Sequence, residues 1–134
     1  MADPQDGRQR IPARSPLEEE IGFTRGLRVG NQIFISGTIG VEADGSVSPD
    51  GGRQAERCYE LIKEHIEELG GHMGDVVRVR MFVTDMADGD AVSAAFSKFL
   101  KPTRPCGTLV QIVALYGPQF KVEIEADAVI GSGQ

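Results

Sequence analysis

The sequence predicts an α+β protein of one small domain, in which a sheet carries helices on one face only. Apolar residues alternate with polar ones in five short segments, as in half-buried strands, and recur every three or four positions in two longer segments, as in helices. The segments follow the order ββαβαββ, with strands grouped at both ends. A chain of 134 residues can bury one core but is too short for two ordinary domains.

The first two strands are expected at residues 24–29 and 32–41, separated by Gly30-Asn31. A Gly-Asn pair between two apolar runs is typical of a tight hairpin. Gly37 interrupts the second run, and a glycine inside a strand indicates either a bulge or a close approach of the backbone to another group.

The first long helix is expected at residues 52–69, and a Gly70-Gly71 pair marks its end. Its apolar residues recur at helical spacing and form one stripe that would face the core. They are Ala55, Cys58, Tyr59, Ile62, Ile66 and Leu69.

The second half of the chain predicts a strand at 76–84, a helix at 87–100 and strands at 108–114 and 121–129. Pro102 and Pro105 end the helix. In the middle strand, Val77, Val79, Met81 and Val83 share one face, and Arg78, Arg80 and Phe82 share the other. In the last strand, Val122, Ile124, Ala126 and Ala128 alternate with Glu123, Glu125 and Asp127.

The chain termini are expected to lie outside the domain. Residues 1–15 hold almost no apolar side chains and are expected to form a flexible arm. The single domain is then 16–130, and 131–134 form a tail. No apolar segment has the length of a secretory signal or a membrane span, so we expect a cytoplasmic protein without a membrane partner.

Charge and residue types exclude several classes of function. The net charge of −6 does not favour binding to nucleic acid, although Arg25, Arg28, Arg78 and Arg80 could form a local basic patch; paired or solvated arginines are the simpler interpretation. Two separated cysteines and two separated histidines give no metal-binding cluster, so neither a metal nor another cofactor is expected. The cysteines are expected to be reduced.

The polar face of the predicted sheet also carries apolar residues, among them Phe82 beside Arg78 and Arg80. Such a mixed face is typical of a subunit contact. A solvated sheet face fits the same pattern.

Three segments together resemble the RidA/YjgF family. They are VGNQIFISGT at 29–38, VVRVRMFVTD at 76–85 and KVEIEADAV at 121–129. The resemblance extends from Phe23 to Val129 in the same order and spacing, except for a longer connection before the last strand. It implies a chorismate-mutase-like subunit in a barrel-like homotrimer, with the helices outside and a ligand cleft between each pair of neighbours.

The resemblance also implies a chemistry. In one branch of the family these clefts hydrolyse enamine or imine intermediates to a keto acid and ammonia. An arginine there binds the substrate carboxylate, a glutamate on the last strand handles the water, and a tyrosine closes the pocket. Glu123 matches the glutamate, while Phe23 stands at the tyrosine position and lacks its hydroxyl group.

The arginine of this family has no direct counterpart in the expected register. Counting back three residues from Val110-Gln111-Ile112 places Gly107 at its position, and Arg104 is the nearest arginine. Arg104 is still the candidate to hold a carboxylate from its loop. An exposed loop arginine or an intersubunit ion pair is the alternative.

The candidate catalytic residues are therefore Glu123 and Arg104. The candidate pocket residues are Phe23, Gly37, Thr38, Phe82, Cys106 and Gly107. Three functions follow from the resemblance: hydrolysis of imines or enamines of a small carboxylate or carbonyl metabolite, ligand binding or regulation without catalysis, and endoribonuclease activity. The missing arginine favours the second over the first, and the negative charge weighs against the third.

Overall fold

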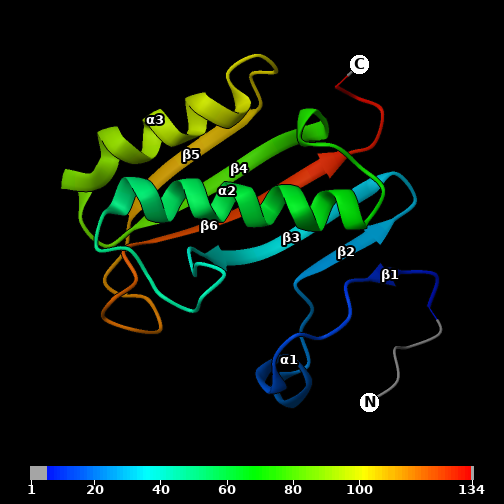
Figure 1. Cartoon of the computed structure of the whole chain (residues 1–134). Helices are drawn as coiled ribbons and strands as arrows, with labels where there is room; N and C mark the ends of the chain where they lie inside the picture. Colours follow the sequence, from blue (N-terminus) through cyan, green and yellow to red (C-terminus); the bar gives the residue numbers. More distant parts are fainter. Residues whose placement is uncertain (1–5, 134) are drawn as a thin grey trace.

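The computed structural model describes residues 6–133 and contains one six-stranded sheet with both long helices on the same face (Figure 1). The strand order is β1-β2-β3-β6-β4-β5. Neighbouring strands are antiparallel except β4 and β5, which are parallel. The strands are β1 (Gln9–Arg10), β2 (Gly26–Val29), β3 (Gln32–Ile39), β4 (Val76–Val83), β5 (Cys106–Gln111) and β6 (Val122–Val129). The predicted α+β class, with helices on one face, is confirmed.

The long helices are α2 (Gly51–Glu68) and α3 (Gly89–Leu100), each within a few residues of its predicted bounds. Asp50 caps α2 by accepting a hydrogen bond from the Gly52 N–H, and Gly70 follows the helix with φ of 93°. A short helix, α1 (Pro16–Ile21), and two 3₁₀ turns, η1 (Met73–Asp75) and η2 (Met86–Asp88), complete the fold. No helix within residues 6–133 is both long and apolar enough to cross a bilayer.

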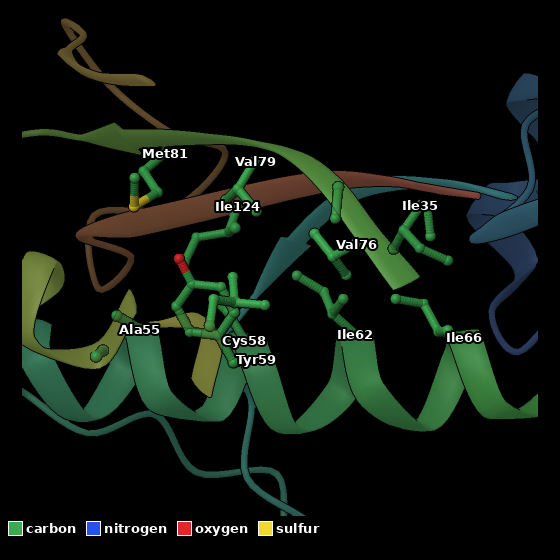
Figure 2. Close-up of a cluster of buried hydrophobic side chains, with 14 of the residues drawn as sticks. Ile35, Ala55, Cys58, Tyr59, Ile62, Ile66, Val76, Val79, Met81 and Ile124 are labelled. Atoms are coloured by element: carbon green, nitrogen blue, oxygen red, sulfur yellow. The ribbon is translucent and has the colours of Figure 1, made fainter. Parts of the chain in front are cut away.

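The core lies between the two long helices and the sheet. All six apolar residues predicted to form the stripe of α2 are buried, and Figure 2 shows five of them, from Ala55 to Ile66, pointing at side chains from the strands. Val79 and Ile124 meet them from β4 and β6. The alternation predicted for β6 is confirmed, because Val122, Ile124, Ala126 and Ala128 are all buried. The opposite face of the sheet has no helix on it, and we call it the open face (Figure 1).

The β2–β3 hairpin turns at Gly30-Asn31, as predicted, with Val29 paired to Gln32. A bulge shifts the register of β3 and β6 between Ile35 and Thr38, so Gly37 does lie in a bulge. A second bulge, between Val76 and Arg78, shifts β4 against β6. The prediction that Val77 faces the core is wrong, because the extra residue of this bulge leaves Val76 buried and Val77 exposed.

The flexible arm expected at residues 1–15 differs from the structure at residues 9–11. Residues 1–5 lie outside the described part. Gln9 and Arg10 form β1, paired with Arg28 and Leu27 of β2, and Ile11 is only 2% exposed. Backbone pairing to a sheet edge does not depend on side-chain polarity, so the polar composition of the segment concealed it.

Ile11→Ala is expected to lower the free energy of unfolding by about 2–3 kcal/mol, because the change removes a buried side chain and leaves a cavity. Ile21→Ala makes the same chemical change in α1 at a side chain that is 64% exposed, and should stay within about 0.5 kcal/mol of wild type. Urea unfolding of both variants at one protein concentration measures the difference. Equal, small effects would mean that residues 6–15 do not pack on the domain.

The tail expected at 131–134 is also held to the domain as far as it is described; Gln134 lies outside the described residues. Asp75, which is 1% exposed, accepts hydrogen bonds from the backbone N–H groups of Gly131 and Gly133 through Oδ1, at 3.1 and 3.3 Å. Its Oδ2 accepts another from the His72 N–H at 3.0 Å. A buried carboxylate with three backbone donors fixes the end of the chain against η1.

Candidate functional site

Glu123 lies at the beginning of β6 on the open face of the sheet. The next residue, Ile124, is fully buried on the helix side, and alternation along the strand turns Glu123 the opposite way. Glu123 is in register with Ile39 of β3 and with Phe82 of β4. The structure therefore brings Glu123 and Phe82, two of the predicted site residues, together.

Gly37 supplies the surface on which the Glu123 carboxyl group rests. A Cβ atom added to Gly37 would lie 2.8 Å from both Cδ and Oε1 of Glu123. A side chain at position 37 would therefore displace the carboxylate. The two interpretations of this glycine from the sequence, a bulge and a close approach, both apply.

The Glu123 carboxylate is half-buried, and no donor in the described part of the chain forms a hydrogen bond with it. Burial raises the pKa of Glu123, the nearby charge of Glu125 raises it further, and the positive charge of Arg25 opposes the shift. On one side the carboxylate borders a cavity of ≈ 400 Å³ with largely apolar walls, including Ile39, Leu115 and Phe120. A carboxylate with free lone pairs in such surroundings is suited to accept a proton.

The segment before β2 flanks the same bulge from the other side. The Ser36 hydroxyl donates to the Thr24 carbonyl at 2.6 Å, and the Ser36 N–H donates to the Arg25 carbonyl at 3.0 Å. The Arg25 guanidinium lies over the Phe23 ring, 5.4 Å from its centroid. Phe23 therefore lies beside Arg25, on the other side of the bulge from Glu123.

Cys106 lies at the other end of the open face, and Arg104 lies in the loop before it. Both line a cavity of ≈ 430 Å³, together with residues that include Val77, Thr103 and Ser132. Arg104 has φ of 48°, the one positive φ of a non-glycine residue within 6–133, and its N–H donates to the Leu100 carbonyl at 3.1 Å. A strained backbone at a cavity supports a functional role for this exposed arginine.

Two predicted pocket residues face the helices instead. Thr38 is 4% exposed, and its carbonyl accepts a hydrogen bond from the Cys58 thiol of α2. Gly107 is paired with the buried Val79, and an added Cβ would lie 3.3 Å from the Phe96 ring of α3. The expectation that Gly107 stands at the position of the carboxylate-binding arginine stays a prediction; a side chain at Gly107 would point at α3 and away from the open face.

The two groups of candidate residues are far apart within one subunit. Along β4, Arg78 is paired with Cys106 and Phe82 with Glu123. Four residues of strand separate these pairs, which is about 13 Å at 3.3 Å per residue. One subunit therefore does not bring Arg104 and Glu123 to the same small ligand.

The sequence interpretation missed the part played by two segments at the Glu123 end. The sequence interpretation assigned Arg25 to a solvated or paired face. Its position directly before Gly26, which is buried, was the available signal that Arg25 lies beside the site. The connection at 112–121 carries Val113 and Tyr116, both fully exposed, and forms part of the wall of the cavity beside Glu123. The signal for this wall was the apolar run that continues at residues 115–116, past the strand predicted at 108–114.

The arrangement can position a small anion and deliver or remove a proton. Glu123 is placed to accept a proton at one end, and the guanidinium groups of Arg25 and Arg104 can donate hydrogen bonds to an anion. Among residues 6–133, no three His, Cys, Asp or Glu side chains gather as a metal site.

Comparison with known proteins agrees with the fold. Residues 14–130 match the family model described as Endoribonuclease L-PSP. A 2-iminobutanoate/2-iminopropanoate deaminase of Salmonella typhimurium is 32% identical over 111 residues, covering 80% of this chain and 86% of the relative.

Two solved structures are similar over most of their length. A member of the YjgF/YER057c/UK114 family from Mycobacterium tuberculosis has a TM-score of 0.84 at 29% identity, covering 92% of this chain and 99% of that one. The TdcF protein of E. coli, solved with bound serine, has a TM-score of 0.74 at 30% identity, covering 80% of this chain and 87% of that one.

Proposed function

Because this chain belongs to the endoribonuclease L-PSP family, which includes the YjgF proteins, we propose that it hydrolyses a small carboxylate-bearing imine or enamine to a keto acid and ammonia. The observation that carries the proposal is the Glu123 carboxylate, half-buried, without a hydrogen-bond partner in the described chain and with a raised pKa. The deaminase activity in the name of the Salmonella relative supports the same reaction.

Glu123 acts on the water molecule in this proposal. Its carboxylate takes a proton from the water as the oxygen attacks the imine carbon and passes this proton to the imine nitrogen, giving a carbinolamine. The carboxylate then takes the hydroxyl proton of the carbinolamine and passes it to the nitrogen as well, so the C–N bond breaks and ammonia leaves as the C=O bond of the keto acid forms. Water and imine are the only reactants, so no cofactor is required.

The site is proposed to form between two copies of the chain in a homotrimer. Arg104 of one copy would hold the substrate carboxylate while Glu123 of the next copy activates water. The separation of these residues within one subunit supports this arrangement, since one copy cannot bring them together. Apolar side chains on the open face, including Phe34 at 42% exposed and Val110 at 39%, also favour burial of this face against a neighbour.

The competing functions have less support. Binding without catalysis has the absence of an arginine at Gly107 in its favour, and it is the alternative that the ammonia assay below tests. Endoribonuclease activity requires contact with a polyanion, for which a net charge of −6 is unfavourable.

The wild-type protein is expected to accelerate release of ammonia and 2-oxobutanoate from 2-iminobutanoate, generated in the assay by an amino-acid oxidase. The rate above spontaneous hydrolysis should be proportional to protein concentration. Light scattering of the same sample should give about three times the chain mass of 14.4 kDa. A stable monomer, or no acceleration for any small imino acid, would contradict the proposal.

A further inference from the structure

Arg25 and Glu123 flank the Gly37 bulge from opposite sides. Arg25 is hydrogen-bonded through its carbonyl to Ser36 of β3, and the Glu123 carboxyl group lies against Gly37, the next residue. Arg25 stands at the bend before β2, and the next residue, Gly26, faces the core side chains of Ile35 and Leu69. The charge of Arg25 affects the pKa of Glu123 in β6 and also that of His65 in α2, so the Arg25 side chain lies within electrostatic reach of both. The backbones of Arg25 and Glu123 are about 10 Å apart, or two strand spacings.

Contacts with Glu18 and Phe23 hold the Arg25 side chain in place. Its Nε lies 3.7 Å from Oε2 of Glu18, whose side chain is 1% exposed. The Arg14 N–H and the Ser15 hydroxyl both donate to the same Glu18 oxygen at 3.0 Å and fix its position. The Phe23 ring supports the flat face of the guanidinium. Such a held arginine loses little conformational freedom when it binds a ligand.

The outer nitrogen atoms of Arg25 are available to a ligand. Within residues 6–133, no acceptor takes a hydrogen bond from either Nη of Arg25, and the side chain is 28% exposed. Two other arginines, Arg28 and Arg53, differ because their guanidinium nitrogens already donate hydrogen bonds within the chain. Arg28 donates to the carbonyls of Gly30 and Leu69, and Arg53 donates to the carboxylates of Glu42 and Glu60. Arg25 thus presents an unused pair of donors in the geometry that suits a carboxylate.

We propose that Arg25 binds a second carboxylate of the substrate, so that the preferred substrates are imines with two carboxylates, of the kind derived from acidic amino acids. The inference rests on the proposed function, in which Arg104 of the neighbouring copy holds the first carboxylate. Glu125 is paired with Arg80, but among the residues that the structure describes Glu123 has no cation in contact with it, so a second anionic group beside Glu123 needs a cation of its own. The opposing effect of Arg25 on the pKa of Glu123 is consistent with this proximity.

The test compares two stable keto acids, 2-oxoglutarate with two carboxylates and 2-oxobutanoate with one, by calorimetric titration of the full-length protein. Wild type is expected to bind 2-oxoglutarate about tenfold more tightly than 2-oxobutanoate, and to prefer the corresponding imine by a similar factor in kcat/KM. Arg25→Gln should remove this preference while changing affinity for 2-oxobutanoate less than twofold. The matched control is Arg28→Gln, which removes the same charge from an arginine bound to carbonyl groups and should keep the preference.

Arg25→Gln leaves the buried Glu18 without its cation and is expected to be less stable. Glu18→Gln/Arg25→Gln removes both charges and measures the preference in a better-folded protein. An unchanged ratio in this double variant, or a wild type that prefers 2-oxobutanoate, would overturn the inference. Turnover of monocarboxylate imines without a preference for dicarboxylate imines would overturn the inference and leave the proposed reaction standing. Arg25-dependent binding of 2-oxoglutarate without turnover of any imine would support the inference and contradict the proposed reaction.

Discussion

Replacement of Glu123 by Gln is expected to lower kcat/KM for imine hydrolysis by a factor of about 100 to 1000. The amide keeps the size of the side chain but cannot accept the proton of the attacking water. The fold should be retained, because the carboxylate forms no hydrogen bond in the described structure and its burial disfavours the charged form. Initial rates of ammonia release and thermal unfolding of the same samples measure both quantities.

Glu125→Gln is the matched control for this change. Glu125 lies on the same strand and face, two residues away, and contacts Arg80 at 3.3 Å. Its loss should leave kcat/KM within a few-fold of wild type. Gly37→Ala provides an independent check, because the added Cβ displaces the end of a flexible Glu123 side chain and should lower activity with little loss of stability. Near wild-type activity of Glu123→Gln would exclude Glu123 as the base.

The pH dependence follows from the direction of the Glu123 pKa shift. The carboxylate is protonated as the pH falls through its raised pKa, so activity should be lost on the acid side at a higher pH than an ordinary glutamate would give. The folded state binds this proton more tightly than the unfolded state does. Burial of the Glu123 charge therefore does not lower the free energy of unfolding below the unfolded-state pKa, and it lowers it fully above the folded-state pKa. Glu123→Gln should remove that acid limb and this effect on stability together.

Mixing two inactive variants is expected to restore activity. In the proposed homotrimer each cleft takes Arg104 from one copy and Glu123 from the next. When Arg104→Ala and Glu123→Gln chains exchange at equal amounts, about one cleft in four receives both native residues, so about a quarter of wild-type activity should appear. Arg104→Ala alone should remain about a hundredfold below wild type, since an unpaired substrate carboxylate in a partly desolvated cleft costs about 3 kcal/mol. Glu123→Gln alone should show the loss of about 100- to 1000-fold given above.

The control for this experiment is each variant subjected to the same unfolding and refolding by itself. Native mass spectrometry of differently tagged chains should show that mixed trimers have formed. If mixed trimers form and activity stays at background, Arg104 and Glu123 of two copies do not act in one cleft, and the proposed arrangement is wrong. Full activity of Arg104→Ala alone would show that Arg104 does not hold the carboxylate.

The sequence by itself determined the local elements and the family. The spacing of Ile62, Ile66 and Leu69 predicted α2 because a helix buries the same face every three or four residues. Alternation around Ile124 predicted β6 and the outward direction of Glu123, because a strand turns successive side chains to opposite faces. Gly37 was recognisable as a special position because a missing Cβ inside a strand requires a reason.

Tertiary structure decided where these elements meet. The pairing of β1 with β2 and the anchoring of the tail by Asp75 depend on backbone hydrogen bonds, which side-chain patterns do not encode. A one-residue bulge turned Val77 to the open face, and the pairing of Gly107 with Val79 turned Gly107 toward α3. Register has a period of two, so a shift of one residue reverses the face of every side chain that follows. The two ends of the open face, and the free donors of Arg25 beside Glu123, therefore became visible only once the strands were paired.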